Sequence, residues 1–162
     1  LVLIALIVFV LLPALITPKT SSVVMSDMSR MRQISMACLM YAMDHRGEYP
    51  ADWTALTNNY ANIPKLFVTH SDEKRAGQMS NVMEWTSFVY VPGLTTASPP
   101  RSVVAYLPLG HYKTRDGGII AFADCSVEWQ PPEQFKETLR GTPTTTSTVP
   151  VEAAPNAAPT VP

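Results

Sequence analysis

The first sixteen residues, Leu1 to Ile16, carry no polar or charged side chain. A helix of this length extends roughly 24 Å, a little less than the roughly 30 Å hydrocarbon core of a bilayer. The chain begins with leucine rather than methionine, so we expect a few upstream residues to complete a membrane-spanning helix that ends near residue 18. A cleaved signal peptide and a buried helix of a soluble core are the alternatives.

The other end of the chain has a composition typical of disorder. Residues 141–162 contain five prolines, seven Thr or Ser and a single charged side chain. Such a segment cannot bury enough apolar surface to offset its chain entropy, so we predict a disordered tail, with a glycosylated stalk as the alternative. Over the whole chain, 12 Lys and Arg balance 13 Asp and Glu, which argues against nucleic acid as a partner.

Between these ends we predict one domain, over residues 19–140, that begins with an amphipathic helix over residues 21–45. Apolar residues recur there at nearly helical spacing, and Ser26, Asp27 and Gly47 fit the usual start and stop signals. The predicted buried face holds Met31, Ile34, Cys38 and Tyr41, and the predicted wet residues are Arg30, Arg32 and Gln33. Six of the eight methionines lie in this helix. They favour adaptable packing over a methionine-lined binding groove.

The rest of the domain is predicted to consist of short secondary-structure elements. We predict a helical turn at Trp53–Tyr60 and strands at 65–69, 82–91, 103–107, 119–124 and 127–130. One long helix followed by strands predicts an α+β fold, with the helix lying across an antiparallel sheet. Strand alternation directs Ile120 and Phe122, with Val127 and Trp129, toward the helix, and Ala121 and Ala123 to the opposite face.

Four stretches in the same order resemble a bacterial family. They are MRQISMACLMYAMDHRGEYP (Met31–Pro50), which follows LLPAL, then FVTHSD (67–72), SFVYVPGL (87–94) and GGIIAFADCSVEW (117–129). Together they resemble type II secretion pseudopilin-like proteins, in particular prepilin-type proteins with a C-terminal signature of His, nine residues and Asp-Gly. The resemblance covers Leu1 to Trp129. It implies a pilin-like fold, in which one long helix has a membrane part and an amphipathic part packed on a small antiparallel sheet.

The signature itself is altered in this chain. His111 and Asp124 are the signature-like residues, but twelve residues separate them, and Cys125 follows Asp124 where the family has glycine. We expect Asp124 to hold the chain reversal by accepting hydrogen bonds from nearby backbone N–H groups. The family's glycine implies a left-handed backbone at Cys125, which would cost a cysteine about 1 kcal/mol. We therefore expect this turn to have changed type or lengthened.

The sequence offers little catalytic or metal-binding chemistry. His45, His70 and His111 are scattered and no nucleophile or phosphate-binding motif occurs, so we predict neither an enzyme nor a bound cofactor. Asp116, Asp124 and Glu128 are weak candidates for a calcium site, although simple solvation is the favoured interpretation. Cys38 and Cys125 could pair if the helix packs on the last hairpin, and two separate thiols are the alternative.

The resemblance implies a membrane-anchored structural subunit of a type II secretion or type IV pilus-like assembly. Its partners would be the lipid bilayer, other pilin-like subunits and the assembly machinery. It would cross the bacterial inner membrane once and hold its domain in the periplasm or extracytoplasmic space. An apolar helix leaves lipid only by packing on other helices, so anchor and assembly surface would coincide at Leu1, Ile4, Phe9, Leu12 and Pro13. The alternative is a non-polymerising, membrane-anchored extracytoplasmic binding domain.

Overall fold

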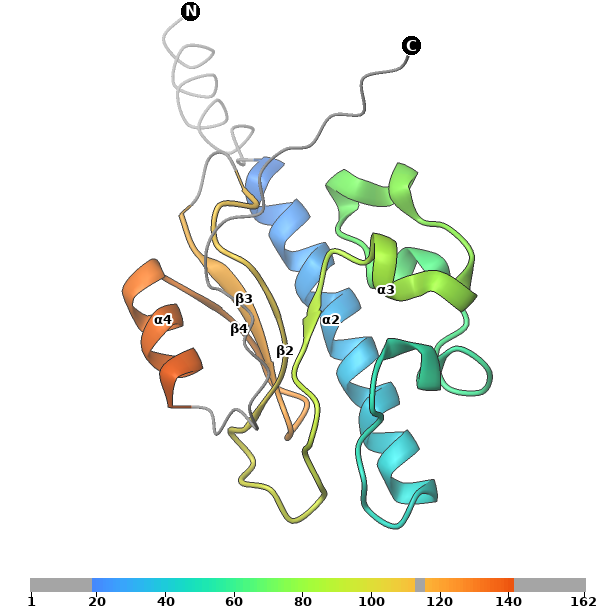
Figure 1. The fold of residues 1–162 in the computed structure, drawn as a ribbon. Coiled ribbons are helices and arrows are strands. Elements are labelled where there is room, and N and C mark those ends of the chain that lie inside the picture. The colour runs from blue at the N-terminus through green and yellow to red at the C-terminus, as the bar shows by residue number, and fades with distance from the viewer. Residues whose placement is uncertain (1–18, 113–115, 142–162) are drawn as a thin grey trace, which may run out of the picture.

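The computed structural model describes residues 19–112 and 116–141, which form an α+β domain as predicted (Figure 1). Helix α2 (Lys19–Asp44) crosses one face of a four-stranded antiparallel sheet, and helix α4 (Pro132–Arg140) covers the other face. The strands are β1 (Val89–Tyr90), β2 (Val103–Leu107), β3 (Gly118–Phe122) and β4 (Val127–Gln130), in that spatial order.

The predicted membrane helix, its residues Leu1, Ile4, Phe9, Leu12 and Pro13, and the tail from residue 142 onward lie outside the described residues. Across residues 19–112 and 116–141, none of the helices combines the length and the apolar character that a membrane crossing requires.

Helix α2 buries the face that its periodicity predicts. Met31, Ile34 and Cys38 are almost fully buried, and Arg32 and Gln33 are exposed. Tyr41 is only half-buried. The prediction for Arg30 is wrong, because only 14% of its side chain is exposed.

The two ends of α2 differ from each other in how well the sequence predicts them. Gly47 adopts φ +86° and its N–H donates to the Ala42 carbonyl at 2.8 Å, so it stops the helix as predicted. The start signal is wrong, because Asp27 lies inside the helix and is fully buried.

The segment between α2 and β1 is made of short helical turns instead of strands. They are 3₁₀ turns η1 (Trp53–Leu56), η2 (Pro64–Phe67), η3 (His70–Arg75) and η4 (Met79–Asn81), followed by α3 (Val82–Trp85). The predicted strand at 65–69 is therefore wrong, and of the one at 82–91 only β1 is present. Three of these elements, η1, η2 and α3, send apolar anchors into the core beside α2, namely Trp53, Phe67 and Val82.

The sheet is buried on both faces, and this corrects the predicted orientation of the last hairpin. Ile119, Ala121 and Val127 lie in the core shared with α2. Ile120 and Phe122 lie on the opposite face, in a second core with Phe135 of α4. The prediction for Val127 and Trp129 is confirmed. The prediction for Ile120, Phe122, Ala121 and Ala123 is reversed, because the unpredicted helix α4 covers the second face.

Candidate functional site

A buried carboxylate lies at the centre of a polar network beside α2. Asp27 is fully buried, and its Oδ1 accepts a hydrogen bond from the His70 backbone N–H at 2.7 Å. Its Oδ2 accepts one from the Tyr112 hydroxyl at 2.8 Å. Burial, and then this hydrogen bond, raise the pKa of Tyr112 well above its ordinary value. Both carboxylate oxygens thus have a donor, as a buried charge requires.

Arg30, one turn further along α2, extends the network to η2 and η3. Its guanidinium donates to the carbonyls of Lys65 (3.0 Å) and Val68 (2.9 Å), and it forms a salt bridge with Glu73. The hydrogen bond from Arg30 lowers the pKa of Glu73. Asp27 and Arg30 therefore clamp the segment 65–73 onto the helix.

His111, a signature-like residue, belongs to this network. Its Nε2 lies 2.8 Å from Thr69 Oγ1 and 3.9 Å from Asp72 Oδ2. A catalytic triad uses one imidazole nitrogen for the nucleophile and the other for the carboxylate. Here the same nitrogen faces both groups, and Thr69 is fully buried. The arrangement fits a structural connection between η3 and the loop after β2.

The nine residues of this network are called the Asp27 cluster below: Asp27, Arg30, Thr69, His70, Asp72, Glu73, Ser87, His111 and Tyr112. Its central residue, Asp27, was not predicted from the sequence to be buried. One signal could have revealed it: Asp27 precedes Met31 by four residues and Ile34 by seven, which places a carboxylate on the predicted buried face.

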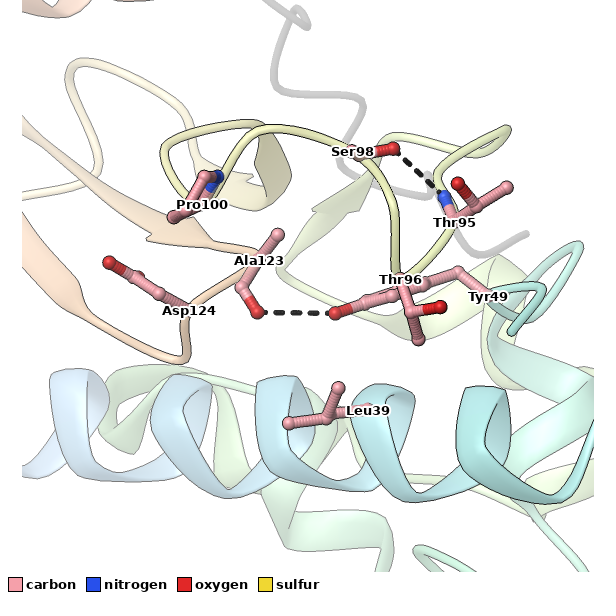
Figure 2. Close-up of a pocket in the computed structure, with 8 residues that line it drawn as sticks. All are labelled: Leu39, Tyr49, Thr95, Thr96, Ser98, Pro100, Ala123 and Asp124. Atoms are coloured by element: carbon pink, nitrogen blue, oxygen red, sulfur yellow. Dashed lines mark hydrogen bonds between the residues drawn. The ribbon is translucent and has the colours of Figure 1, made fainter.

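A second candidate site is a shallow pocket of about 190 Å³ between α2 and the β3–β4 turn (Figure 2). Leu39 of α2 forms its floor, and the Tyr49 hydroxyl donates to the Ala123 carbonyl at 3.1 Å across it. Burial raises the pKa of Tyr49 to about 12. The remaining lining residues are Thr95, Thr96, Ser98, Pro100 and Asp124. Because Asp124 is bound by Ser126, the polar groups of this open pocket are mainly the hydroxyls of Thr95, Thr96 and Ser98.

Asp124 has the role that the sequence predicts. Its Oδ1 accepts hydrogen bonds from the Ser126 N–H at 2.9 Å and the Ser126 hydroxyl at 2.5 Å. The hydroxyl, as the larger effect, and the N–H both lower the pKa of Asp124.

The backbone of this turn corrects a second expectation. Cys125 N–H donates to the Phe122 carbonyl at 3.0 Å, and Phe122 N–H donates to the Ser126 carbonyl at 2.9 Å. These bonds define a three-residue hairpin loop whose last residue is left-handed, a position that favours glycine. Cys125 occupies it with φ +62°. The expected change of turn type is therefore wrong, because the cysteine itself adopts the strained conformation.

The weak calcium candidates have other surroundings. Glu128 forms a bidentate ion pair with Arg101, at 2.7 and 2.9 Å, and this pairing lowers the pKa of Glu128. Asp124 is bound to Ser126, and Asp116 is exposed. In the described ranges, no group of three or more His, Cys, Asp or Glu side chains is arranged to hold a metal ion. His111 lies in the Asp27 cluster and Asp124 at the hairpin turn, so the signature-like residues belong to different sites.

A third feature is an apolar surface on α2. Met25, Met36, Met40 and Met43 are each more than half exposed, between 52% and 74%. At 3.6 residues per turn they lie within about 60° of one another around the helix, opposite the face that packs on the sheet. We call these four residues the methionine stripe. Met36, Met40 and Met43 are neighbours at spacings of four and three residues, while the exposed Ser29 and Arg32 lie between Met25 and Met36. An exposed apolar patch on a helix is a candidate interaction surface.

No protein-family model, curated protein or solved structure matches the chain.

Proposed function

We propose that this protein is a membrane-anchored, pseudopilin-like structural subunit that assembles with other pilin-like subunits. The apolar segment before residue 18 serves as anchor, the domain lies outside the cytoplasm, and helix α2 joins the two. The proposal includes a pilin-like fold, a place in the bacterial inner membrane, and a type II secretion or type IV pilus-like machinery as partner.

The observation that carries the proposal is the methionine stripe. A 26-residue helix that lies on a sheet with one face presents large apolar side chains along the other. Exposing apolar side chains to water is unfavourable, so each methionine that a partner covers contributes favourably to the free energy of association. Methionine also adapts its shape to a partner surface, which suits repeated helix-to-helix contacts.

Two further observations support the proposal. The sequence places an apolar segment directly before α2, so that anchor and stripe can belong to one continuous interface. The Asp27 cluster fixes the first half of α2 to the domain, so a contact made by the stripe also orients the domain.

A photo-crosslinking experiment tests the proposal in bacterial membranes. A photoreactive amino acid replaces Met36 of the full-length chain, and the matched control carries it at Met83. Met83 is a methionine of α3 that is 50% exposed, almost as much as Met36. Irradiation is expected to give covalent multimers of the chain, or adducts with other pilin-like subunits, from Met36 and not from Met83.

A charge variant supplies the second arm. Met36→Asp with Met40→Asp should abolish crosslinking from a photoreactive residue at Met43, while the melting temperature stays within about 2 °C because both positions are exposed. Monomer alone from Met36, or equal multimers from Met36 and Met83, contradicts the proposal. A Met36 adduct with a protein that is not pilin-like favours the anchored binding domain instead.

A further inference from the structure

The helix that carries Cys38 and the turn that carries Cys125 meet at one carbonyl group. The Phe122 carbonyl accepts a hydrogen bond from the Cys125 N–H at 3.0 Å. It also accepts one from the hydroxyl of Ser35, a buried residue of α2, at 3.1 Å. The Ser35 side chain and the Cys125 backbone therefore share an acceptor, which brings the β3–β4 turn into direct contact with α2.

Cys38 lies one turn beyond Ser35 on the same buried face of α2. Residues three apart on a helix have Cβ atoms about 5–6 Å apart. The Cys125 thiol is hydrogen-bonded to the Ser35 side chain, so its sulfur lies on the side of the turn that faces the helix. After burial, the nearby Cys125 is the next cause that raises the pKa of the Cys38 thiol, so the two thiols are neighbours. Both thiols are free in the structure.

The conformation of Cys125 gives an independent reason to single it out. Its φ of +62° is one that residues with a Cβ adopt at a cost of about 1 kcal/mol, and glycine would avoid that cost. Strained backbone conformations of this kind cluster at functional sites, which motivates a closer look at the Cys125 side chain. In this conformation the turn is linked to α2 through Ser35, whose hydroxyl contacts both the Phe122 carbonyl and the Cys125 thiol.

We propose that Cys38 and Cys125 form an intramolecular disulfide that fastens the β3–β4 turn to helix α2 when the protein meets a small-molecule disulfide. The bond would close a loop of about 90 residues, spanning most of the domain.

The unequal burial of the two thiols sets the order of the chemistry. Cys125 is partly exposed and Cys38 is fully buried, and burial raises the pKa of both thiols. The Cys125 thiolate attacks one sulfur of oxidised glutathione, which gives a mixed disulfide and releases one glutathione thiol. The Cys38 thiol then loses its proton, attacks the Cys125 sulfur and expels the second glutathione. The two protein thiols lose two electrons and two protons, and glutathione disulfide takes them up as two thiols.

Thiol counting on the purified full-length protein in detergent tests the proposal. The protein is equilibrated with oxidised glutathione, denatured in acid and alkylated, and its peptides are mapped without reduction. We expect no alkylated cysteine, one peptide pair linked through Cys38 and Cys125, and a melting temperature raised by about 10 °C. Two alkylated cysteines, a glutathione adduct that persists on Cys125, or disulfide-linked dimers would each overturn the proposal.

Two single variants provide matched controls. Cys125→Ser keeps the left-handed residue and should lose both the cross-link and the rise in melting temperature. Cys38→Ala should accumulate the Cys125–glutathione adduct, because the resolving thiol is gone. A wild-type rise in melting temperature that survives in either variant contradicts the cross-link. The assay uses only purified protein, so its outcome is independent of the location and assembly proposed above.

Discussion

Replacing Asp27 tests whether the polar network clamps α2 to the domain. Asp27→Leu keeps a similar volume and removes both acceptors, so that the His70 N–H and the Tyr112 hydroxyl lose their partner. An orphaned buried donor costs about 1–3 kcal/mol, so two donors predict a loss of about 4 kcal/mol in the free energy of unfolding.

Asp27→Asn should cost much less. The amide oxygen can still accept from the His70 N–H, and the Tyr112 hydroxyl can turn to accept from the amide NH₂. Only the charge assistance of the hydrogen bonds is lost, which is worth about 1 kcal/mol. Combining each substitution with Tyr112→Phe in a double-mutant cycle separates the Tyr112 contribution from that of His70.

Urea unfolding of the full-length chain in mild detergent, followed by tryptophan fluorescence, measures these differences. Ser29→Leu is the matched control, because Ser29 lies two residues further along α2 and is exposed; its effect should stay within about 0.5 kcal/mol. The clamp is contradicted if the free energy of unfolding of Asp27→Leu also stays within about 0.5 kcal/mol of the native value. It is contradicted as well if Asp27→Asn loses as much stability as Asp27→Leu.

Further outcomes are expected of the domain. Ile34→Asp should unfold it by burying an unpaired charge, while Gln33→Asp on the exposed side should leave circular dichroism melting unchanged; equal melting temperatures would mean that the wrong face was assigned. Burial raises the pKa of Tyr49 to about 12 and that of Tyr112 further, so their contribution to stability is complete below about pH 10 and is lost as pH rises through the folded-state values. An alkaline denaturation series that shows no loss between pH 10 and 12 would contradict this assignment. In reduced protein, Cys125→Gly should be neutral or stabilise by up to about 1 kcal/mol, and Asp124→Asn should cost less than about 1 kcal/mol. Added calcium should leave the melting temperature of the native protein and of both variants unchanged. A rise in the native protein that disappears in Asp124→Asn would instead indicate a metal site.

The sequence predicts well those parts of the fold in which apolar residues recur regularly or over a long stretch. Strands β2 and β4 have the predicted bounds, and the buried face of α2 follows its 3.6-residue repeat. Short apolar runs were ambiguous. The residues around Phe67 and Val82 resemble strands in composition, but Pro64 favours the start of a helical turn and the two anchors reach the core from irregular backbone.

The orientation of the last hairpin shows a limit of alternation. The two-residue alternation along a strand identifies which side chains share a face of the sheet. It correctly separates Ile120 and Phe122 from Ala121. It cannot say which face meets α2 when both faces are covered. The covering helix α4 was missed because only Phe135 and Leu139 give it an apolar side, at a spacing of four residues.

The Asp27 cluster could not have been predicted as a whole, because its members come from four segments that only tertiary folding brings together. A local pattern assigns Asp27 to a helix start, where a carboxylate is common. Its actual partners are a backbone N–H 43 residues away and a hydroxyl 85 residues away. Two fixed contacts on one half of α2 leave the helix little freedom to roll on the sheet. Under the proposed function this rigidity has a consequence, since subunits joined through the methionine stripe would hold their domains in one orientation. Asp27→Asn weakens these contacts. It should therefore make the orientation of the domains within the crosslinked multimers less uniform before it prevents the multimers from forming.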